Sequence, residues 1–177
     1  MNEEQAPMNS GEVSELIKKS DRIASGEDSD VFAVNGLVLK RYKNLSLSDL
    51  QIYQKIVSEA AIAINDLQIN SILGNLFVKV NPITQVVESA DNFEVITISP
   101  EVIGKNPNDL LRNGELSQKN FNNLSAQLDE LSRVVMAEVS YRGIHIIPWN
   151  TLIVENDEKK QIVITDICKR LSDLAKF

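Results

Sequence analysis

The chain has 177 residues, of which 43% are hydrophobic and 24% charged, and this length is enough for one globular domain with a real core. Its net charge of −7 and pI of about 4.8 argue against nucleic acid or a membrane as a partner, because phosphate groups are bound mainly by clustered lysines and arginines. The single cysteine, Cys168, excludes an intramolecular disulfide and a cysteine-rich zinc site.

The first 12 residues, MNEEQAPMNSGE, are polar and acidic, and we expect them to form a disordered tail. This segment lacks the basic start and the apolar run of a secretory signal. No apolar stretch of the sequence approaches the roughly 20 residues that cross a bilayer. A cytoplasmic location is therefore expected.

A β-hairpin is predicted close to this tail. The strands VFAV and LVLKRY flank Asn35 and Gly36, the residue pair that two-residue hairpin turns favour. The segment before them, VSELIKKSDRIAS, predicts a short helix or a strand that leads into the turn GEDSD.

A helix is predicted next, over residues 46–67, with Ser46 or Ser48 as its N-terminal cap. Apolar residues recur there every three or four positions: Leu50, Tyr53, Val57, Ala60, Ile64 and Leu67. Two β-rich runs follow, NLFVKVNPITQVVES and NFEVITISP, and predict a second hairpin. The first half of the chain therefore has the predicted order β-β-β-α-β-β.

The second half is predicted to be mainly helical. NPNDLLRNGE predicts a short helix, and the segment from residue 116 to Gly143 predicts a long one that Gly143 ends. The apolar stripe of the long helix is Phe121, Leu124, Leu128, Leu131, Val135 and Val139. TLIVEN and QIVITDI flank the polar turn DEKK and predict a third hairpin, before a final amphipathic segment, CKRLSDLAKF.

This order of elements resembles the protein-kinase-like fold, in particular its small members of the lipopolysaccharide-kinase and Rio type, from about residue 20 to 168. The resemblance implies an α+β chain with two lobes in one compact domain. Residues 13–99 would form an N-lobe with a five-stranded antiparallel sheet and one helix. Residues 100–177 would form a truncated, mainly helical C-lobe that carries a β-hairpin.

The resemblance also implies residues for nucleotide binding. In that family a lysine on the third strand binds the α- and β-phosphates and pairs with a glutamate of the next helix. Lys40 of LVLK and Glu59 match these positions, although either taken alone is consistent with an ordinary surface charge. Gly26 matches the middle glycine of the phosphate-binding loop, in which Ala24 and Ser29 replace the other two.

The family's catalytic loop matches YRGIHIIPWN. Asn150 matches the asparagine that holds magnesium, and Asp166 matches the second metal-binding residue after the hairpin. The position of the catalytic aspartate is occupied by His145, the single histidine of the chain. A neutral imidazole can accept a proton near pH 7, so His145 is a candidate base; the alternative is a structural histidine, half-buried between its isoleucine neighbours and hydrogen-bonded to backbone.

Three functions stay open. The expected one is a degenerate kinase-like domain, a pseudokinase that binds ATP with Mg²⁺ and acts through a protein partner. Three features favour this function over the alternatives. Position 145 holds a histidine instead of an aspartate, the C-lobe is short, and the phosphate-binding loop contains the acidic residues Glu27, Asp28 and Asp30. The alternatives are an active minimal ATP-dependent phosphotransferase on an unknown substrate, and an α+β interaction module that binds no nucleotide.

Overall fold

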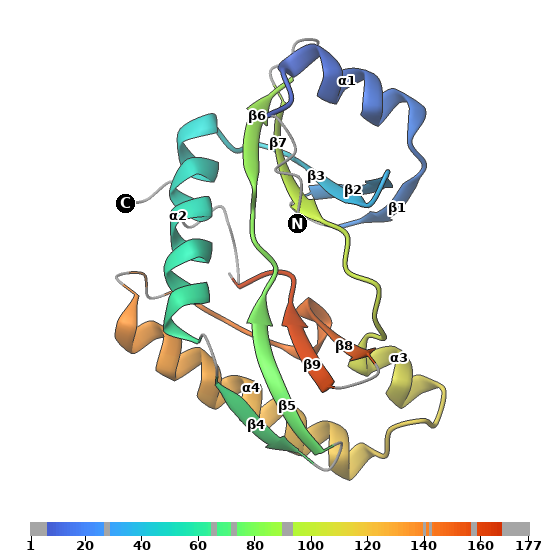
Figure 1. Cartoon of the computed structure of the whole chain (residues 1–177), viewed down its shortest axis with the longest axis vertical. Helices are drawn as coiled ribbons and strands as arrows, with labels where there is room; N and C mark the ends of the chain where they lie inside the picture. The colour runs from blue at the N-terminus through green and yellow to red at the C-terminus, as the bar shows by residue number, and fades with distance from the viewer. Residues whose placement is uncertain are drawn as a thin grey trace. The chain divides into compact units, whose positions relative to one another are not determined.

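The computed structural model describes residues 7–26, 29–64, 67–71, 74–89, 94–139, 141, 143–156 and 159–167. Within these, the chain divides into two compact units, one of residues 7–54 and 83–101 and the other of residues 55–82 and 102–167. Each unit combines helices with a sheet of its own, which confirms the predicted α+β class (Figure 1). Among the helices of the described residues, none combines the length and apolar character needed to cross a membrane.

The first unit is built on a five-stranded antiparallel sheet, as predicted. Its strands are β1 (Arg22–Ser25), β2 (Ser29–Val34), β3 (Leu37–Tyr42), β6 (Gln85–Glu88) and β7 (Val95–Pro100). They lie in the order β1-β2-β3-β7-β6, and every neighbouring pair is antiparallel. Asn35 and Gly36 join β2 to β3 with φ values of 51° and 74°, the left-handed conformation that a two-residue hairpin turn requires.

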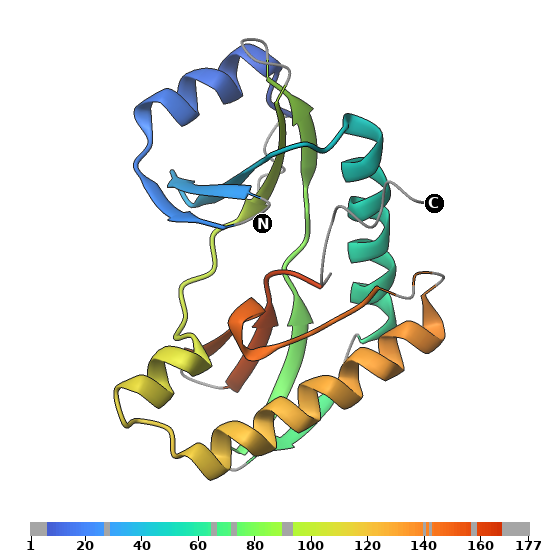
Figure 2. The same ribbon diagram turned by 180° about the vertical axis from the view of Figure 1, so that it is seen from behind.

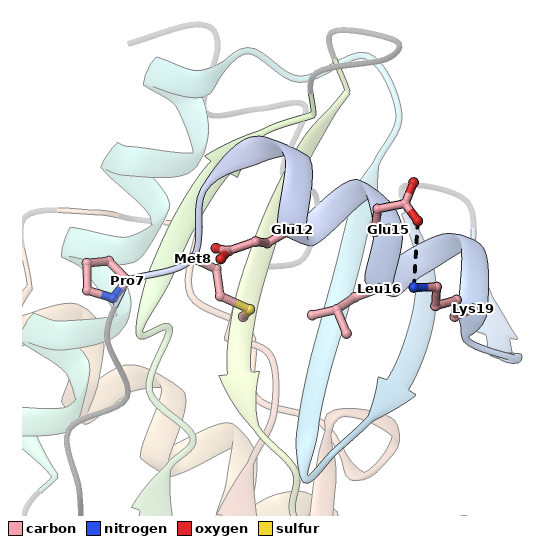
Figure 3. Close-up of a pocket in the computed structure, with 6 residues that line it drawn as sticks. All are labelled: Pro7, Met8, Glu12, Glu15, Leu16 and Lys19. Carbon is pink, nitrogen blue, oxygen red and sulfur yellow. Dashed lines mark ion pairs between the residues drawn. The ribbon is translucent and has the colours of Figure 1, made fainter.

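Helix α1 (Ser10–Lys19) lies across one face of this sheet (Figures 1 and 3). It begins with a capping box, in which Asn9 accepts from the Glu12 amide and Glu12 accepts from the Asn9 amide. Its Val13 is fully buried in an apolar cluster with Phe32, Leu39, Val87, Ile96 and Ile98 of the sheet. The tail expected over residues 1–12 is thus helical from Ser10, and residues 1–6 lie outside the described residues.

Strand alternation divides the side chains of β3 between the two faces of the sheet. Leu39 faces α1 because it belongs to the apolar cluster under that helix, and Arg41 lies on the same face, with its guanidinium 5.3 Å from the centre of the Phe32 ring. Lys40 therefore lies on the opposite face, next to Val31 of β2 and Thr97 of β7.

Helix α2 (Leu47–Ala63) follows β3 and begins where the sequence predicts. The Ser46 hydroxyl accepts from the Asp49 amide and the Asp49 carboxylate accepts from the Ser46 amide, at 3.2 and 2.9 Å. The predicted stripe is buried from Leu50 to Ile64. The expected end at residue 67 is wrong, because Leu67 lies beyond the helix and its carbonyl accepts from the Val78 amide of the next sheet.

The second unit holds a four-stranded mixed sheet. Its strands are β4 (Gln68–Ser71), β5 (Gly74–Val80), β8 (Thr151–Asn156) and β9 (Lys159–Ile164), in the order β4-β5-β9-β8. The β8–β9 hairpin was predicted; its parallel pairing with β5 was not. The run NLFVKVNPITQVVES is split between the two sheets, at a point that includes Pro82, which cannot donate a ladder hydrogen bond.

Two helices complete this unit, α3 (Pro107–Arg112) and α4 (Gln118–Glu138). Helix α4 covers one face of the second sheet (Figure 2) and buries most of its predicted stripe: Leu124, Leu128, Leu131 and Val135. The predicted stop at Gly143 is wrong, since α4 ends at Glu138 and Val139 is already extended. Gly143 instead contacts the Tyr141 ring so closely that a side chain would have no room. The final segment CKRLSDLAKF lies outside the described residues.

Candidate functional site

The first unit carries the residues expected to bind phosphate. Lys40 is half-buried on β3, on the face of the sheet away from α1. Its cross-strand neighbours Val31 and Thr97 make this part of the face apolar or uncharged, and Thr97 is buried. The binding of a nucleotide phosphate by Lys40 stays a prediction.

The turn between β1 and β2 contains the predicted phosphate-binding residues Gly26 and Ser29. The Gly26 amide donates to the Ser29 carbonyl at 2.8 Å, and Ser29 is the first residue of β2. The amide of Gly26 is therefore committed to closing this turn. Glu27 and Asp28, at its tip, lie outside the described residues.

Asp30, which the sequence counts among the acidic residues of this loop, is buried and surrounded by cations. Its carboxylate accepts from the Ser25 hydroxyl at 2.6 Å and from the Arg41 guanidinium at 3.1 Å. Lys43 and Arg22 lie 3.4 and 3.6 Å from the same carboxylate. The Ser25 hydrogen bond, then Arg41 and Lys43, hold the pKa of Asp30 far below its ordinary value.

The position of Asp30 corrects one expectation about nucleotide binding. Asp30 pairs with Arg41 across the β2–β3 ladder, so it lies on the α1 face, away from Lys40. Its charge is already compensated there by Arg41 and Lys43. Of the three acidic residues that the sequence places in the phosphate-binding loop, Asp30 therefore carries a compensated charge, on the face of the sheet opposite Lys40.

A groove of about 430 Å³ lies along α1 (Figure 3). It is lined by Pro7, Met8, Glu12, Glu15, Leu16 and Lys19. Glu12 is engaged in the helix cap, and Glu15 forms an ion pair with Lys19 at 3.7 Å. Because the groove lies on the α1 side of the sheet, it is separate from the face that carries Lys40.

Glu59, the predicted partner of Lys40, lies on the part of α2 that belongs to the second unit. It forms an ion pair with Lys55, one helical turn earlier, at 3.8 Å. Because Lys40 and Glu59 belong to different compact units, their pairing stays a prediction.

The second unit carries the loop with His145. Ile144 and Ile146 are buried, and His145 between them is half-buried. The His145 amide donates to the Ile167 carbonyl, and the Ile146 amide donates to the Ser132 hydroxyl of α4, both at 2.8 Å. These bonds fix the backbone at His145, and the role of its imidazole, as a base or as a structural group, stays a prediction.

Asn150 lies at the end of the short 3₁₀ helix η1 (Pro148–Asn150). Its carbonyl accepts from both the amide and the hydroxyl of Thr165, at 2.8 and 3.1 Å. Asp166 follows Thr165 directly and is half-buried. The structure therefore places the segments of Asn150 and Asp166 next to each other. Asn150 ends η1, and Asp166 follows the end of β9.

Asn106, at the N-terminus of α3, also contacts this loop, and sequence reasoning missed it as a site residue. Its side-chain amide donates to the carbonyls of Pro148, Trp149 and Thr151. The sequence signal, an asparagine before a proline, indicates a helix cap, and does not indicate the contact with residues more than forty positions away.

Trp149 in the same loop is 57% exposed, so it is not a core residue. Arg112 of α3 lies over its ring at 5.1 Å from the centre, a distance at which a cation and an aromatic ring attract. Helix α3 therefore supports the loop at two points.

The donor set around Asn150 and Asp166 fits magnesium better than a metal with a full protein shell. No group of three or more histidine, cysteine, aspartate or glutamate side chains is placed to hold a metal within the described ranges. Mg²⁺ is commonly bound by one or two protein oxygen ligands, with water and substrate phosphates completing its shell. Asn150 and Asp166 are oxygen donors of that kind on adjoining segments, and their binding of Mg²⁺ stays a prediction.

Comparisons with known proteins do not assign the chain to a family. No family model matches the sequence, and no curated protein matches it. Among solved structures, the chain is similar to the kinase domain of Mycobacterium tuberculosis PknI, crystallised as a double mutant, with 10% identity and a TM-score of 0.45. That alignment covers 84% of this chain and 60% of the PknI chain.

Proposed function

We propose that the protein is a degenerate kinase-like domain that binds ATP with Mg²⁺ and acts through a protein partner. The observation that supports this proposal most is the pair of hydrogen bonds from Thr165 to the Asn150 carbonyl. These bonds hold the two predicted magnesium residues, Asn150 and Asp166, on adjoining segments. The contact continues the β8–β9 ladder, because Asn150 directly precedes β8 and Thr165 directly follows β9.

Each residue has a defined task in the proposed complex. Asn150 and Asp166 would hold Mg²⁺, which supplies the positive charge that neutralises the nucleotide phosphates. Lys40 would donate to the phosphates from the face of the first sheet on which Val31 and Thr97 are its cross-strand neighbours. The loss of the carboxylate at position 145 removes the group that would orient and deprotonate an acceptor hydroxyl.

Nucleotide binding is tested by thermal unfolding with ATP and Mg²⁺. A ligand present at 100 times its Kd stabilises the native state by about 2.7 kcal/mol, which for a domain of this size raises the Tm by roughly 5–10 °C. Lys40→Ala and Asp166→Asn are expected to remove the shift. The matched control Lys79→Ala changes an exposed lysine of β5 and is expected to keep it. No shift at millimolar ATP and Mg²⁺ refutes the proposal.

The absence of efficient phosphotransfer is tested by ADP release. We expect the wild type to release ADP no faster than the Asp166→Asn variant. His145→Asp restores the carboxylate, and since a general base contributes about 10²- to 10⁴-fold, its rate is expected to exceed that of the wild type. Wild-type turnover that Asp166→Asn abolishes would instead establish the alternative, an active phosphotransferase.

A further inference from the structure

The side chain of Asn106 makes hydrogen bonds in two directions. Its Oδ1 accepts from the amide and from the side chain of Asn108, both at 2.9 Å, and so caps α3. Its Nδ2 donates to the carbonyls of Pro148, Trp149 and Thr151 at 3.2, 3.1 and 3.1 Å. One side chain thus joins the start of α3 to the loop that carries Asn150.

The carbonyls around Asn150 are all held by hydrogen bonds. Asn106 holds those of residues 148, 149 and 151, and Thr165 holds that of Asn150 itself. The three carbonyls share one –NH₂ group with only two protons, so each bond is longer than the usual 2.9–3.0 Å. Without this donor, the carbonyls of Trp149 and Thr151 would each lose a hydrogen bond, whereas the Pro148 carbonyl would keep those from the amide and hydroxyl of Thr151.

The backbone of Asn106 is itself fixed. Lys105 exchanges two backbone hydrogen bonds with Ile153 of β8, at 2.9 and 2.8 Å. At Gly104 a side chain would meet the Ile153 carbonyl at 2.8 Å, so the chain lies directly against β8. Asn106 is therefore anchored to the β8–β9 hairpin, which begins directly after Asn150 and ends shortly before Asp166.

We propose that Asn106 is a positioning residue, which fixes the backbone around Asn150 and thereby sets the affinity of the site for a divalent cation. The inference rests on the proposed function for the identity of the ligand. The fixation of the loop follows from the hydrogen bonds alone, so the two parts can be tested separately.

We call the three hydrogen bonds from the Asn106 Nδ2 to the loop carbonyls the clamp. Two substitutions separate the effect of the clamp from that of the helix cap. Asn106→Asp keeps an oxygen that caps α3 and removes the donor to the three carbonyls. Asn106→Ser keeps a capping hydroxyl and adds no charge. It replaces Asn106→Asp in both measurements if the aspartate variant does not fold. Asn123→Asp, at an exposed position of α4, is the control for the added charge. A carboxylate at position 106 would attract a cation, so a loss of affinity in Asn106→Asp cannot be an effect of charge.

The first measurement is amide hydrogen exchange at Asn150 and Thr151, whose amides donate to the carbonyls of Ile147 and Pro148. We expect exchange about tenfold faster in both Asn106 variants, with the Leu128 and Leu131 amides of α4 unchanged. The second measurement is a Mn²⁺ titration in the presence of ATP. Mutation of residues that orient a metal ligand typically lowers metal affinity by about 10- to 100-fold. We expect both Asn106 variants to lose Mn²⁺ affinity within this range.

The outcomes distinguish the inference from the proposed function. Unchanged exchange at Asn150 and Thr151 overturns the inference, whatever the nucleotide does. Faster exchange with unchanged Mn²⁺ affinity overturns the link between the loop and the cation. A wild type that binds no Mn²⁺ with ATP refutes the proposed function, and with it the ligand part of the inference, while faster exchange in the variants would still establish the clamp.

Discussion

Replacing Ser132 by alanine removes the hydrogen bond that holds the His145 loop on helix α4. The Ser132 hydroxyl donates to the Leu128 carbonyl at 2.9 Å and accepts from the Ile146 amide at 2.8 Å. Ser132 is 4% exposed and Ile146 is fully buried, so water cannot replace the lost acceptor. The substitution therefore leaves a buried N–H group without a partner.

The expected cost follows from these contacts. A buried donor without a partner costs about 1–3 kcal/mol. Alanine is a better helix former than serine by about 0.5 kcal/mol, which offsets part of this cost. The Leu128 carbonyl lies inside α4 and keeps the backbone bond of the helix. The net loss of unfolding free energy is expected to be about 0.5–2.5 kcal/mol.

Urea denaturation followed by circular dichroism measures this loss as a lower midpoint with an unchanged slope. The control is Ser125→Ala, at a half-buried position of the same helix, which tests helix propensity without the contact to Ile146. We expect its stability to equal or exceed that of the wild type. If Ser132→Ala is as stable as Ser125→Ala, the loop does not depend on this hydrogen bond and the reasoning is refuted.

Three further predictions concern the scaffold. Gly104→Ala forces a Cβ to 2.8 Å from the Ile153 carbonyl and should cost about 1–3 kcal/mol, whereas Gly11→Ala, in the first turn of α1, should not lower the urea midpoint. Asp30→Asn should flatten the acid limb of stability: a carboxylate with a lowered folded pKa contributes stability above its unfolded pKa of about 3.9 and loses it below. Equal slopes between pH 2 and 5 for the variant and the wild type would contradict this. Leu39→Ala, in the fully buried cluster under α1, should cost about 2–5 kcal/mol in urea denaturation, and a loss below 1 kcal/mol would show that this core tolerates the cavity.

Local patterns in the sequence predicted the elements whose formation depends on neighbouring residues. Asn35 and Gly36 specify their hairpin because few residue pairs accept two left-handed positions. Ser46 specifies the start of α2 because its hydroxyl can satisfy an amide of the first turn. The stripe of α4 is buried as its period indicates.

The features that were missed depend on residues far apart in the sequence. Whether β5 pairs with β7, as the predicted second hairpin implies, or with β9 is not encoded in β5 itself, since its alternating apolar residues fit either neighbour. The direction of the Asp30 carboxylate depends on strand register, which sequence inspection did not resolve. Asn106 carries a local signal for its cap and none for its contacts with the loop.

Because β5 pairs in parallel with β9, the sheet of the second unit cannot be completed until the ribosome has synthesised β9. Phe77 pairs with Gln161 and Val80 with Ile164, so during translation the β4–β5 hairpin emerges long before the strand that covers its edge. An uncovered strand edge can pair with another chain, and contacts between distant residues form slowly. A nascent or cleaved chain that lacks β9 would expose the edge of β5, and this edge would be open to pairing with another chain.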